Sequence, residues 1–234
     1  MRTFDSPWVT GNIGQYINEV NELLKVAHLK KYGANQPVYL QGERSQRFYF
    51  LKKGRVKISV FREDGTEKIL AIQEENTFFG ESAAFDDQPY FATATLLEPS
   101  EIYCIQRNDF MKLIKKTPSI ALMLICALIR KMRLLAFQVE DLSFLDAQKR
   151  VAHILLTLGH ELGVRKEDGL NIQKRITHND LAQLTGLSRV TVTNVLNYME
   201  RLHIIRKRRC VLTIIDQERL TNLLSTSSIE TTGH

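Results

Sequence analysis

Cysteine is scarce in this chain of 234 residues, and its three copies, Cys104, Cys126 and Cys210, lie far apart. Such an odd and scattered set forms no disulfide framework and lacks the spacing of zinc ligands. The six histidines are scattered as well, so we predict no metal site. These absences favour a protein of the reducing cytoplasm.

Long apolar runs are also missing, because the longest, from Ile120 to Ile129, is too short to span a bilayer. The opening residues Met1-Arg2-Thr3-Phe4-Asp5 have no apolar core, so we expect no signal peptide. The sequence shows no convergent nucleophile and base, and we therefore predict no catalytic residues and no enzymatic activity.

Basic residues are concentrated near the C-terminus of a chain whose net charge is +6 and whose isoelectric point is near 9.2. Only two anions, Asp180 and Glu200, oppose the cations of this segment, which are Lys174, Arg175, Arg189, Arg201, Arg206, Lys207, Arg208 and Arg209. Such a cluster attracts the phosphate backbone of DNA and makes binding depend on salt. A solvated basic surface with no partner is the alternative.

The stretch from Thr177 to Arg201 has the pattern of two short helices joined by a tight turn. Thr177 and Asp180 have the spacing of a capping box, Gly186 falls in the turn, and Ser188 is placed to cap the second helix. Apolar residues three or four apart predict a buried stripe: Leu181, Leu184, Leu187, Val192, Val195, Leu196, Met199 and Leu202. We interpret the stretch as a helix-turn-helix, with an αα-corner in an ordinary helical domain as the alternative.

The opposite face of the second helix carries side chains that can contact base edges and phosphates. A short basic hairpin, Ile204 to Lys207 and Cys210 to Ile215, is expected next, as a wing placed to contact phosphate. The predicted DNA contacts are Thr177, Ser188, Arg189, Val190, Thr191, Thr193, Asn194, Arg208 and Arg209.

Short β-type runs separated by turn signals extend from Val38 to Gln106 and predict an antiparallel sandwich or barrel. Val56, Ile58 and Val60 alternate with polar residues, as in a half-buried strand. Gly80 follows a strand and opens a short helical turn whose backbone amides could hold an anion. A plain glycine turn with a capping glutamate is the alternative.

A helical pattern extends from Pro118 to Leu145, with apolar residues that step by four and three like a coiled-coil seam. We predict a parallel homodimer, which would set two reading helices about 34 Å apart on palindromic DNA. The expected interface residues are Ile125, Leu128, Met132, Leu135, Val139 and Leu142. Packing against the chain's own β domain is the alternative, and part of the helix is expected to do so through Leu124, Ile129, Leu134 and Phe137.

Beyond this helix, Asp146 is expected to open another helix that ends at Gly163. Gly169 and its neighbours are expected to form a loop, and a last short helix is expected from Asp216 through Leu224.

These parts, in this order, resemble the CRP/FNR family of bacterial transcription regulators from about Val38 to Leu224. The most specific segments are Leu142-Ser143-Phe144-Leu145-Asp146, similar to the family's hinge, and Ser188-Arg189-Val190-Thr191-Val192. The resemblance implies an α+β fold, with a cyclic-nucleotide-binding-like antiparallel β-roll, a long dimerisation helix and a C-terminal winged helix-turn-helix domain. It also implies a ligand-gated homodimer on double-stranded DNA, with RNA polymerase as a further partner.

The resemblance divides the chain into three parts. Residues 1–116 are expected to form the effector-sensing β-roll with an N-terminal extension, which includes a helix around Ile17 to Val26. Residues 117–145 are expected to form the dimerisation helix, and residues 146–234 the DNA-binding domain.

The implied effector site departs from that of cAMP-binding members, in which an arginine and a serine or threonine hold the cyclic phosphate. This chain has Phe91 and Ala92 there, and Leu135 and Ala136 replace the helix residues that contact adenine. A buried phosphate without a guanidinium is left unpaired at a large cost, so we predict that cAMP is not the effector. We expect a small organic effector, with an aromatic acid as one candidate, at Gly80, Glu81, Ser82, Phe91, Ala92, Thr93, Leu135 and Ala136.

Other branches of the family show further similarities. The run Phe91-Ala92-Thr93-Ala94 and Val190 look like the regulators of anaerobic organohalide respiration. The run from Ser188 to Thr193 resembles the cyanobacterial nitrogen regulator that senses 2-oxoglutarate. No cysteine precedes Cys104, so the iron–sulfur cluster of oxygen-sensing members is not expected, and no other cofactor is predicted. A haem-binding branch stays an alternative, although no histidine is well placed as a ligand.

The reading helix also departs from many relatives, which have glutamate where this chain has Val190 and arginine where it has Asn194. Arg189 should donate a bidentate pair to guanine, Val190 can pack on a thymine methyl, and asparagine suits adenine. We predict a half-site richer in A·T than the catabolite activator's. The alternative function is a cyclic-nucleotide-like sensor module that gates another protein rather than DNA.

Overall fold

The computed structural model describes residues 8–9, 16–173, 176–208 and 211–225. The chain forms two compact units, of which the first spans Pro7–Leu135 and the second begins at Ala136. The division into residues 1–116, 117–145 and 146–234 stays a prediction. No helix in the described part of the chain is long and apolar enough to cross a membrane.

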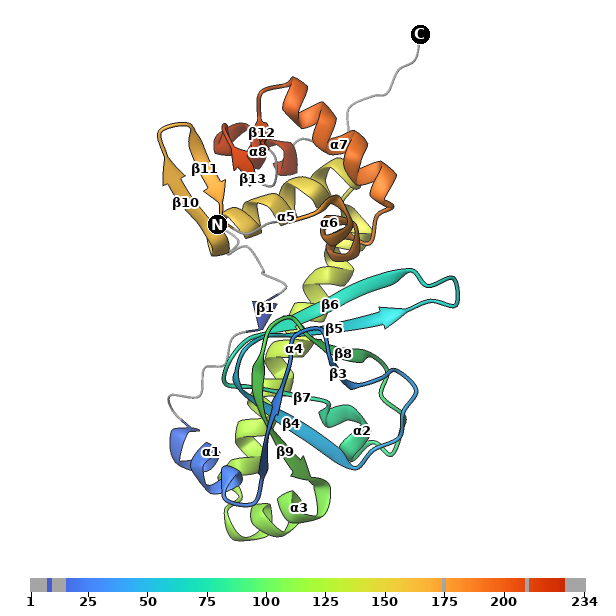
Figure 1. The fold of residues 1–234 in the computed structure, drawn as a ribbon, viewed down its shortest axis with the longest axis vertical. Coiled ribbons are helices and arrows are strands. Elements are labelled where there is room, and N and C mark those ends of the chain that lie inside the picture. The colour runs from blue at the N-terminus through green and yellow to red at the C-terminus, as the bar shows by residue number, and fades with distance from the viewer. Residues whose placement is uncertain (1–7, 10–15, 174–175, 209–210, 226–234) are drawn as a thin grey trace. The chain divides into compact units, whose positions relative to one another are not determined.

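The first unit is a β-roll with short helices at its end (Figure 1). Its elements are β1 (Trp8–Val9), α1 (Ile17–Leu24), β2 (His28–Tyr32), β3 (Pro37–Tyr39), β4 (Arg47–Lys53), β5 (Val56–Phe61), β6 (Glu67–Gln73), β7 (Thr77–Phe79), α2 (Glu81–Phe85), β8 (Thr93–Leu96), β9 (Ser100–Gln106), α3 (Arg107–Lys116) and the first part of α4 (Ser119–Phe144). The short strands β2, β3 and β7 and the helix α3 were not predicted from the sequence.

Two sheets make up the roll, with strand orders β1-β6-β5-β8-β3 and β2-β9-β4-β7. The predicted antiparallel arrangement is confirmed for all of these pairs except β1 with β6, which is parallel. The hairpin of β5 and β6 projects from the body of the roll (Figure 1).

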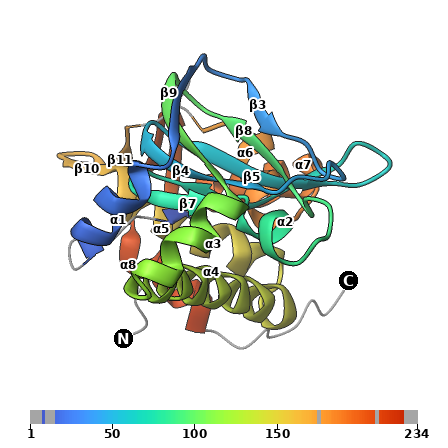
Figure 2. The same cartoon turned by 90° about the horizontal axis from the view of Figure 1, so that it is seen from below.

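Buried residues of the roll gather in two clusters. One lies inside the sheets around Leu51, Val56 and Ile102. The other joins Phe48 and Phe50 of β4 to the helices α1, α3 and α4, the last two of which lie on the same side of the roll (Figure 2). The helices therefore close one end of a barrel that the sheets alone would leave open.

The alternation predicted for β5 is wrong at Ser59. Val56 and Ile58 are buried as expected, and the half-buried Val60 packs against the same core cluster, but Ser59 is only 1% exposed. The pairing with β6 has a bulge between Ile58 and Ser59, which shifts the register by one residue. The two neighbouring side chains at this bulge are therefore both buried, which strict alternation does not allow.

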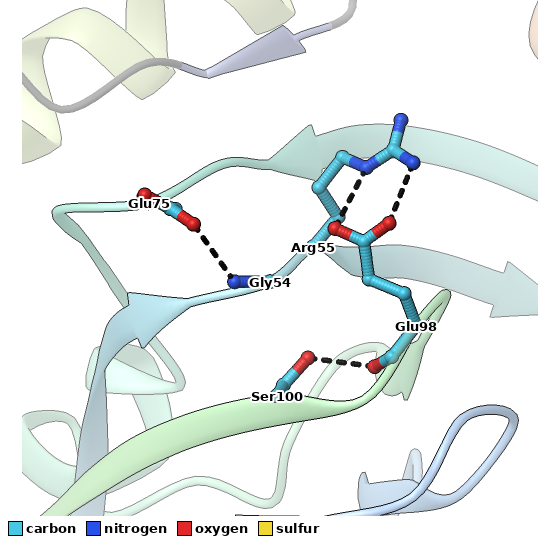
Figure 3. A network of polar contacts seen from close by, with 5 residues as sticks. All are labelled: Gly54, Arg55, Glu75, Glu98 and Ser100. Carbon is cyan, nitrogen blue, oxygen red and sulfur yellow. Dashed lines mark hydrogen bonds and ion pairs between the residues drawn. The ribbon is translucent and has the colours of Figure 1, made fainter.

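The turn between β4 and β5 is fixed by a small polar network (Figure 3). Arg55 donates to both carboxylate oxygens of Glu98, at 3.2 and 2.7 Å, and the Gly54 amide donates to Glu75 at 3.3 Å. Gly54 has a φ of +102°, and a Cβ on it would lie 2.8 Å from the Cβ of Ser100. The turn therefore requires glycine for both its conformation and its close packing.

Helix α4 buries one face and exposes the predicted seam. Ile120, Met123, Leu124 and Leu134 are buried, which confirms the packing expected for Leu124 and Leu134. Ile129 is 40% exposed but lines a cavity beside the sheet, whereas the expectation is wrong for Phe137, which is 38% exposed. All six predicted interface residues are exposed in the single chain: Ile125, Leu128, Met132, Leu135, Val139 and Leu142.

The second unit contains the rest of α4 and the elements α5 (Ala147–Leu162), β10 (Gly163–Lys166), β11 (Gly169–Ile172), α6 (His178–Thr185), α7 (Arg189–Arg201), β12 (Ile205–Arg208), β13 (Val211–Ile214) and α8 (Gln217–Ser225). Asp146 caps α5 by accepting from the Lys149 amide at 2.9 Å, as predicted. The helices α5, α6, α7 and α8 pack together beside a four-stranded antiparallel sheet, β10-β11-β13-β12.

The loop predicted around Gly169 is wrong, because β10 and β11 form a hairpin there. Gly169 has a φ of +128° and lies against the backbone of Ile214, where a side chain would overlap the carbonyl. The hairpin could not be predicted from the sequence, because β10 is almost fully exposed and lacks the alternation that marks a half-buried strand.

Candidate DNA-reading surface and effector cavity

The first helix of the predicted helix-turn-helix, α6, begins with the expected capping box. The Thr177 hydroxyl accepts from the Asp180 amide at 3.1 Å, and the Asp180 carboxylate accepts from the Thr177 amide at 2.8 Å. Gly186 ends the helix with a φ of +70°, the left-handed conformation that the turn requires. The N-terminal end of α6 is therefore set by side-chain hydrogen bonds and its C-terminal end by the backbone freedom of glycine.

The second helix, α7, begins at Ser188, whose hydroxyl accepts from the Thr191 amide at 3.0 Å. The buried stripe is confirmed at Val192, Val195, Leu196 and Met199. Leu184, Leu187 and Leu202, which were expected to be buried in the same core, are only half-buried. The stripe attaches α7 to α5, α6 and β12 and leaves the opposite face free.

The free face of α7 presents the predicted base-contacting residues to solvent. Arg189 and Asn194 are exposed, and Val190 is 69% exposed despite its apolar side chain. Thr193 is half-buried because its hydroxyl donates to the Arg189 carbonyl at 2.8 Å and also meets Nδ1 of His178 at 2.8 Å. His178 is a member of this surface that the sequence reasoning missed.

The predicted wing is the hairpin of β12 and β13. Arg208 is exposed at the end of β12, whereas Arg209, like Lys174 and Arg175, lies outside the described residues. Lys207 of β12 contacts α7, because its ammonium donates to Asn197 Oδ1 at 2.6 Å and pairs with Glu200 Oε2 at 3.0 Å.

The charge cluster is partly neutralised by its own neighbours. Burial alone would raise the pKa of Glu200, but hydrogen bonds and the charge of Lys207 lower it below its ordinary value. Arg206 is likewise paired with Asp168 at 3.2 Å. Among the described residues, the cluster's cations without an ion pair are Arg189, Arg201 and Arg208, all exposed. These three are the cations most available to phosphate.

A cavity of about 620 Å³ lies in the β-roll unit, between α2, the sheet and α4. Six of the eight predicted effector residues line it, namely Gly80, Glu81, Ser82, Phe91, Ala92 and Leu135. Thr93 and Ala136 do not. The Thr93 hydroxyl instead accepts from the Gln41 amide at 3.0 Å, and Ala136 is exposed on α4.

Two polar residues of this cavity, Gln73 and Lys131, were not predicted from the sequence. Lys131 of α4 donates to Glu81 Oε1 and to the Phe78 carbonyl, both at 2.6 Å. The other carboxylate oxygen of Glu81 and the side-chain oxygen of Gln73 are buried without a hydrogen-bond partner among the described residues. Two hydrogen-bond acceptors therefore lie unused in the wall of a largely apolar cavity.

Aromatic rings form one wall of the cavity. The rings of Tyr39 and Tyr90 stack with their centroids 3.8 Å apart, and Phe79 lies 6.2 Å from Tyr39. Burial, followed by the nearby charge of Glu81, raises the pKa of Tyr39 well above its ordinary value, so its hydroxyl stays protonated. Gly80 has a φ of +76°, and a Cβ on it would lie 3.0 Å from the Tyr39 ring. Glycine therefore lets the ring and the start of α2 approach closely.

Metal-ligating groups do not converge anywhere in the described part of the chain. Cys104 is buried, as expected for a small apolar side chain, while Cys126 is half-buried, and Cys210 lies outside the described residues.

A β-roll with a ligand-sized cavity and a winged helix-turn-helix together define a ligand-responsive DNA-binding protein. Comparison with known families gives the same two parts: the cyclic nucleotide-binding domain matches residues 29–117, and the Crp-like helix-turn-helix domain matches residues 149–223.

Curated relatives match along most of their length. The cAMP-activated global transcriptional regulator CRP of Pasteurella multocida is 34% identical over 78% of this chain and 87% of the relative. The cyclic AMP receptor protein of Thermus thermophilus is 31% identical over 80% of this chain and 84% of the relative. The chain therefore belongs to the CRP family of ligand-responsive, DNA-binding transcription regulators.

Solved structures share the fold at lower identity. The c-di-GMP-responsive global regulator CLP of Xanthomonas campestris superimposes with a TM-score of 0.77 at 20% identity, over 84% of this chain and 98% of that one. The regulator CprK, complexed with OCPA, gives a TM-score of 0.72 at 19% identity, over 95% of this chain and 100% of that one. At such identities the likeness concerns the fold and leaves the effector open.

Proposed function

We propose that this protein is a homodimer whose affinity for palindromic promoter DNA is set by a small organic effector other than cAMP. The effector would bind in the cavity of the β-roll. The observation that carries this proposal is the charge of the cavity wall, whose described residues include two carboxylates and one ammonium that is already paired with Glu81.

A cyclic phosphate finds no unpaired cation among the described residues of this wall. Lys131 is the one cation among the described lining residues, and it is held by Glu81 at 2.6 Å with both side chains largely buried. Asp86 adds a second negative charge, and Phe91 and Ala92 bring no donor side chains. A bound anion would have to break the buried pair or stay uncompensated, and both are costly.

An effector that fits would have an apolar body and hydrogen-bond donors. Its body would pack against the apolar lining, which includes Phe79 and Phe91. Its donors would satisfy Glu81 Oε2 and Gln73 Oε1, which lack partners among the described residues. A hydroxyl- or amino-bearing organic molecule meets both needs, whereas an aromatic acid would have to take Lys131 away from Glu81. We propose no further cofactor.

The effector would influence the dimer because the cavity and the predicted seam share residues. Ile125, Leu128, Met132 and Leu135 line the cavity, and each is at least 40% exposed in the single chain. A ligand that contacts these side chains changes the surface that a second α4 would pack against, and it can favour one dimer geometry over another. The DNA-bound dimer would then act on transcription through RNA polymerase.

Calorimetric titration of the full chain with cAMP tests the proposal, with the double variant Phe91→Arg, Ala92→Ser as a control for the site. We expect no heat of binding from the wild type at concentrations that saturate cAMP-activated regulators. Measurable binding by the double variant would show that the cavity is open and that Phe91 and Ala92 of the wild type exclude the nucleotide. Tight binding of cAMP by the wild type would contradict the proposal.

A further inference from the structure

His178 is the first residue of α6 and bridges the two helices of the reading unit. Its Nδ1 lies 2.8 Å from the Thr193 hydroxyl, which belongs to the exposed face of α7. In a helix-turn-helix the first helix crosses the DNA backbone, so its N-terminal end is a place where phosphates approach. The imidazole is thus half-buried within the DNA-facing surface.

The hydrogen bonds around Thr193 fix which nitrogen of the neutral imidazole carries the proton. The Thr193 hydroxyl donates its single hydrogen to the Arg189 carbonyl, which can only accept. Nδ1 of His178 must therefore donate to the Thr193 oxygen. The other nitrogen, Nε2, is then a bare acceptor, and it has no partner within the part of the chain that the structure describes.

We propose that His178 is a phosphate-contacting residue of the DNA interface that acts only as the imidazolium, so that DNA binding takes up a proton. A bare Nε2 would present a lone pair to a phosphate oxygen and repel it. A second proton converts Nε2 into a donor for a charge-assisted hydrogen bond. The proposal rests on the DNA-binding function and is independent of the effector.

The charged neighbours make this protonation depend on DNA. Burial, together with Lys207 of β12 and Arg189 of α7, lowers the pKa of His178 in the free protein. The nearby carboxylates are already engaged, since Glu200 is paired with Lys207 and Asp180 is bound within the capping box. DNA phosphates would neutralise both cations and supply an acceptor, so they would raise the pKa that the free protein keeps low. Affinity for DNA should therefore rise as the pH falls.

The test is the pH dependence of binding to a random-sequence duplex of about 30 base pairs, long enough for two half-sites, followed by fluorescence anisotropy with the full chain. For the wild type, we expect the dissociation constant to fall by up to about tenfold per pH unit for each bound protomer, and so by up to about a hundredfold for the dimer, as the pH is lowered from about 8 to about 6. In His178→Asn the amide can still donate to Thr193 but nothing titrates, so this slope should flatten. His178→Arg should bind tightly across the whole range.

His203→Asn is the matched control, because His203 is exposed in the same domain and its φ of +55° suits asparagine. This variant should keep the pH slope of the wild type. A His178→Asn variant that also keeps that slope would overturn the inference. Should the variant fail to fold, the imidazole NMR titration of the wild type decides, since a pKa of His178 that DNA does not raise contradicts the proposal. Failure of the wild type to bind the duplex at any pH would instead refute DNA binding itself.

Discussion

Arg189 is the side chain of the reading surface best placed to select a base. It is exposed at the start of α7 and, within the described residues, makes no ion pair that would compete with DNA for its guanidinium. Its two parallel donors match the O6 and N7 acceptors of guanine. Base recognition by this protein should therefore depend on Arg189 more than on any cation of the wing, which we expect to contact phosphates.

Replacing Arg189 with alanine should remove the preference for one base pair in each half-site, with a loss of roughly 1–3 kcal/mol of discrimination there. Binding to a set of duplexes with single base-pair changes measures this. Arg201→Ala is the control, because Arg201 is an exposed cation at the far end of the same helix and should weaken all duplexes alike. An Arg189→Ala variant with an unchanged preference at every position would refute the assignment.

Val190 predicts a second, independent change of specificity. Its side chain is 69% exposed, which gives no packing reason for an apolar residue at this point of α7. A valine can pack on the methyl group of thymine, whereas a glutamate accepts a hydrogen bond from cytosine. Val190→Glu should shift the preferred base at one position from thymine to cytosine in a selection from random DNA. If the wild type and the variant select the same sequences, residue 190 does not face the bases.

At the scale of elements, the turn between β4 and β5 should be the least tolerant part of the roll. Gly54→Ala meets both a φ of +102° and the side chain of Ser100, so we expect a loss of about 2–4 kcal/mol in the free energy of unfolding. Gly65→Ala, in the tip of the β5–β6 hairpin, has a φ of +81° but open space around it and should cost only about 1–2 kcal/mol. Urea unfolding of both variants measures the difference. Equal losses would mean that backbone strain alone, and not the contact with Ser100, makes the turn intolerant.

The reading unit could be predicted from the sequence because its signals are local. A capping box at Thr177, a glycine at the turn and a cap at Ser188 each act over three or four residues, and the structure shows all three. The bulge after Ile58 is different, since it arises from pairing with another strand and leaves no trace in the alternation of β5 itself.

For the effector cavity, too, only part of the site could be predicted from the sequence. Phe91 and Leu135 could be placed near an effector through the family resemblance, and both line the cavity. The pairing of Lys131 with Glu81 joins residues fifty positions apart, and Gln73 comes from a strand that carried no functional signal. Contacts between such distant segments depend on tertiary packing, and a single sequence does not reveal them.

For the whole molecule, the exposed seam of α4 predicts that the protein is a dimer. Val139 is 62% exposed in the single chain, although its neighbours along the seam are all apolar. Val139→Glu would place two carboxylates against each other at the interface, and we expect a monomer in sedimentation equilibrium. Arg133→Glu puts the same side chain on the exposed face away from the seam and should leave the dimer intact. A Val139→Glu variant that stays dimeric would exclude this seam as the interface.

We expect this protein to bind DNA electrostatically and to do so without responding to cAMP. Titration of DNA with the full chain over a series of salt concentrations, with and without cAMP, tests both expectations at once. The affinity should fall steeply as the salt concentration rises and should be the same in the presence of the nucleotide. An affinity that is independent of salt, or one that rises sharply when cAMP is added, would show that one of them is wrong.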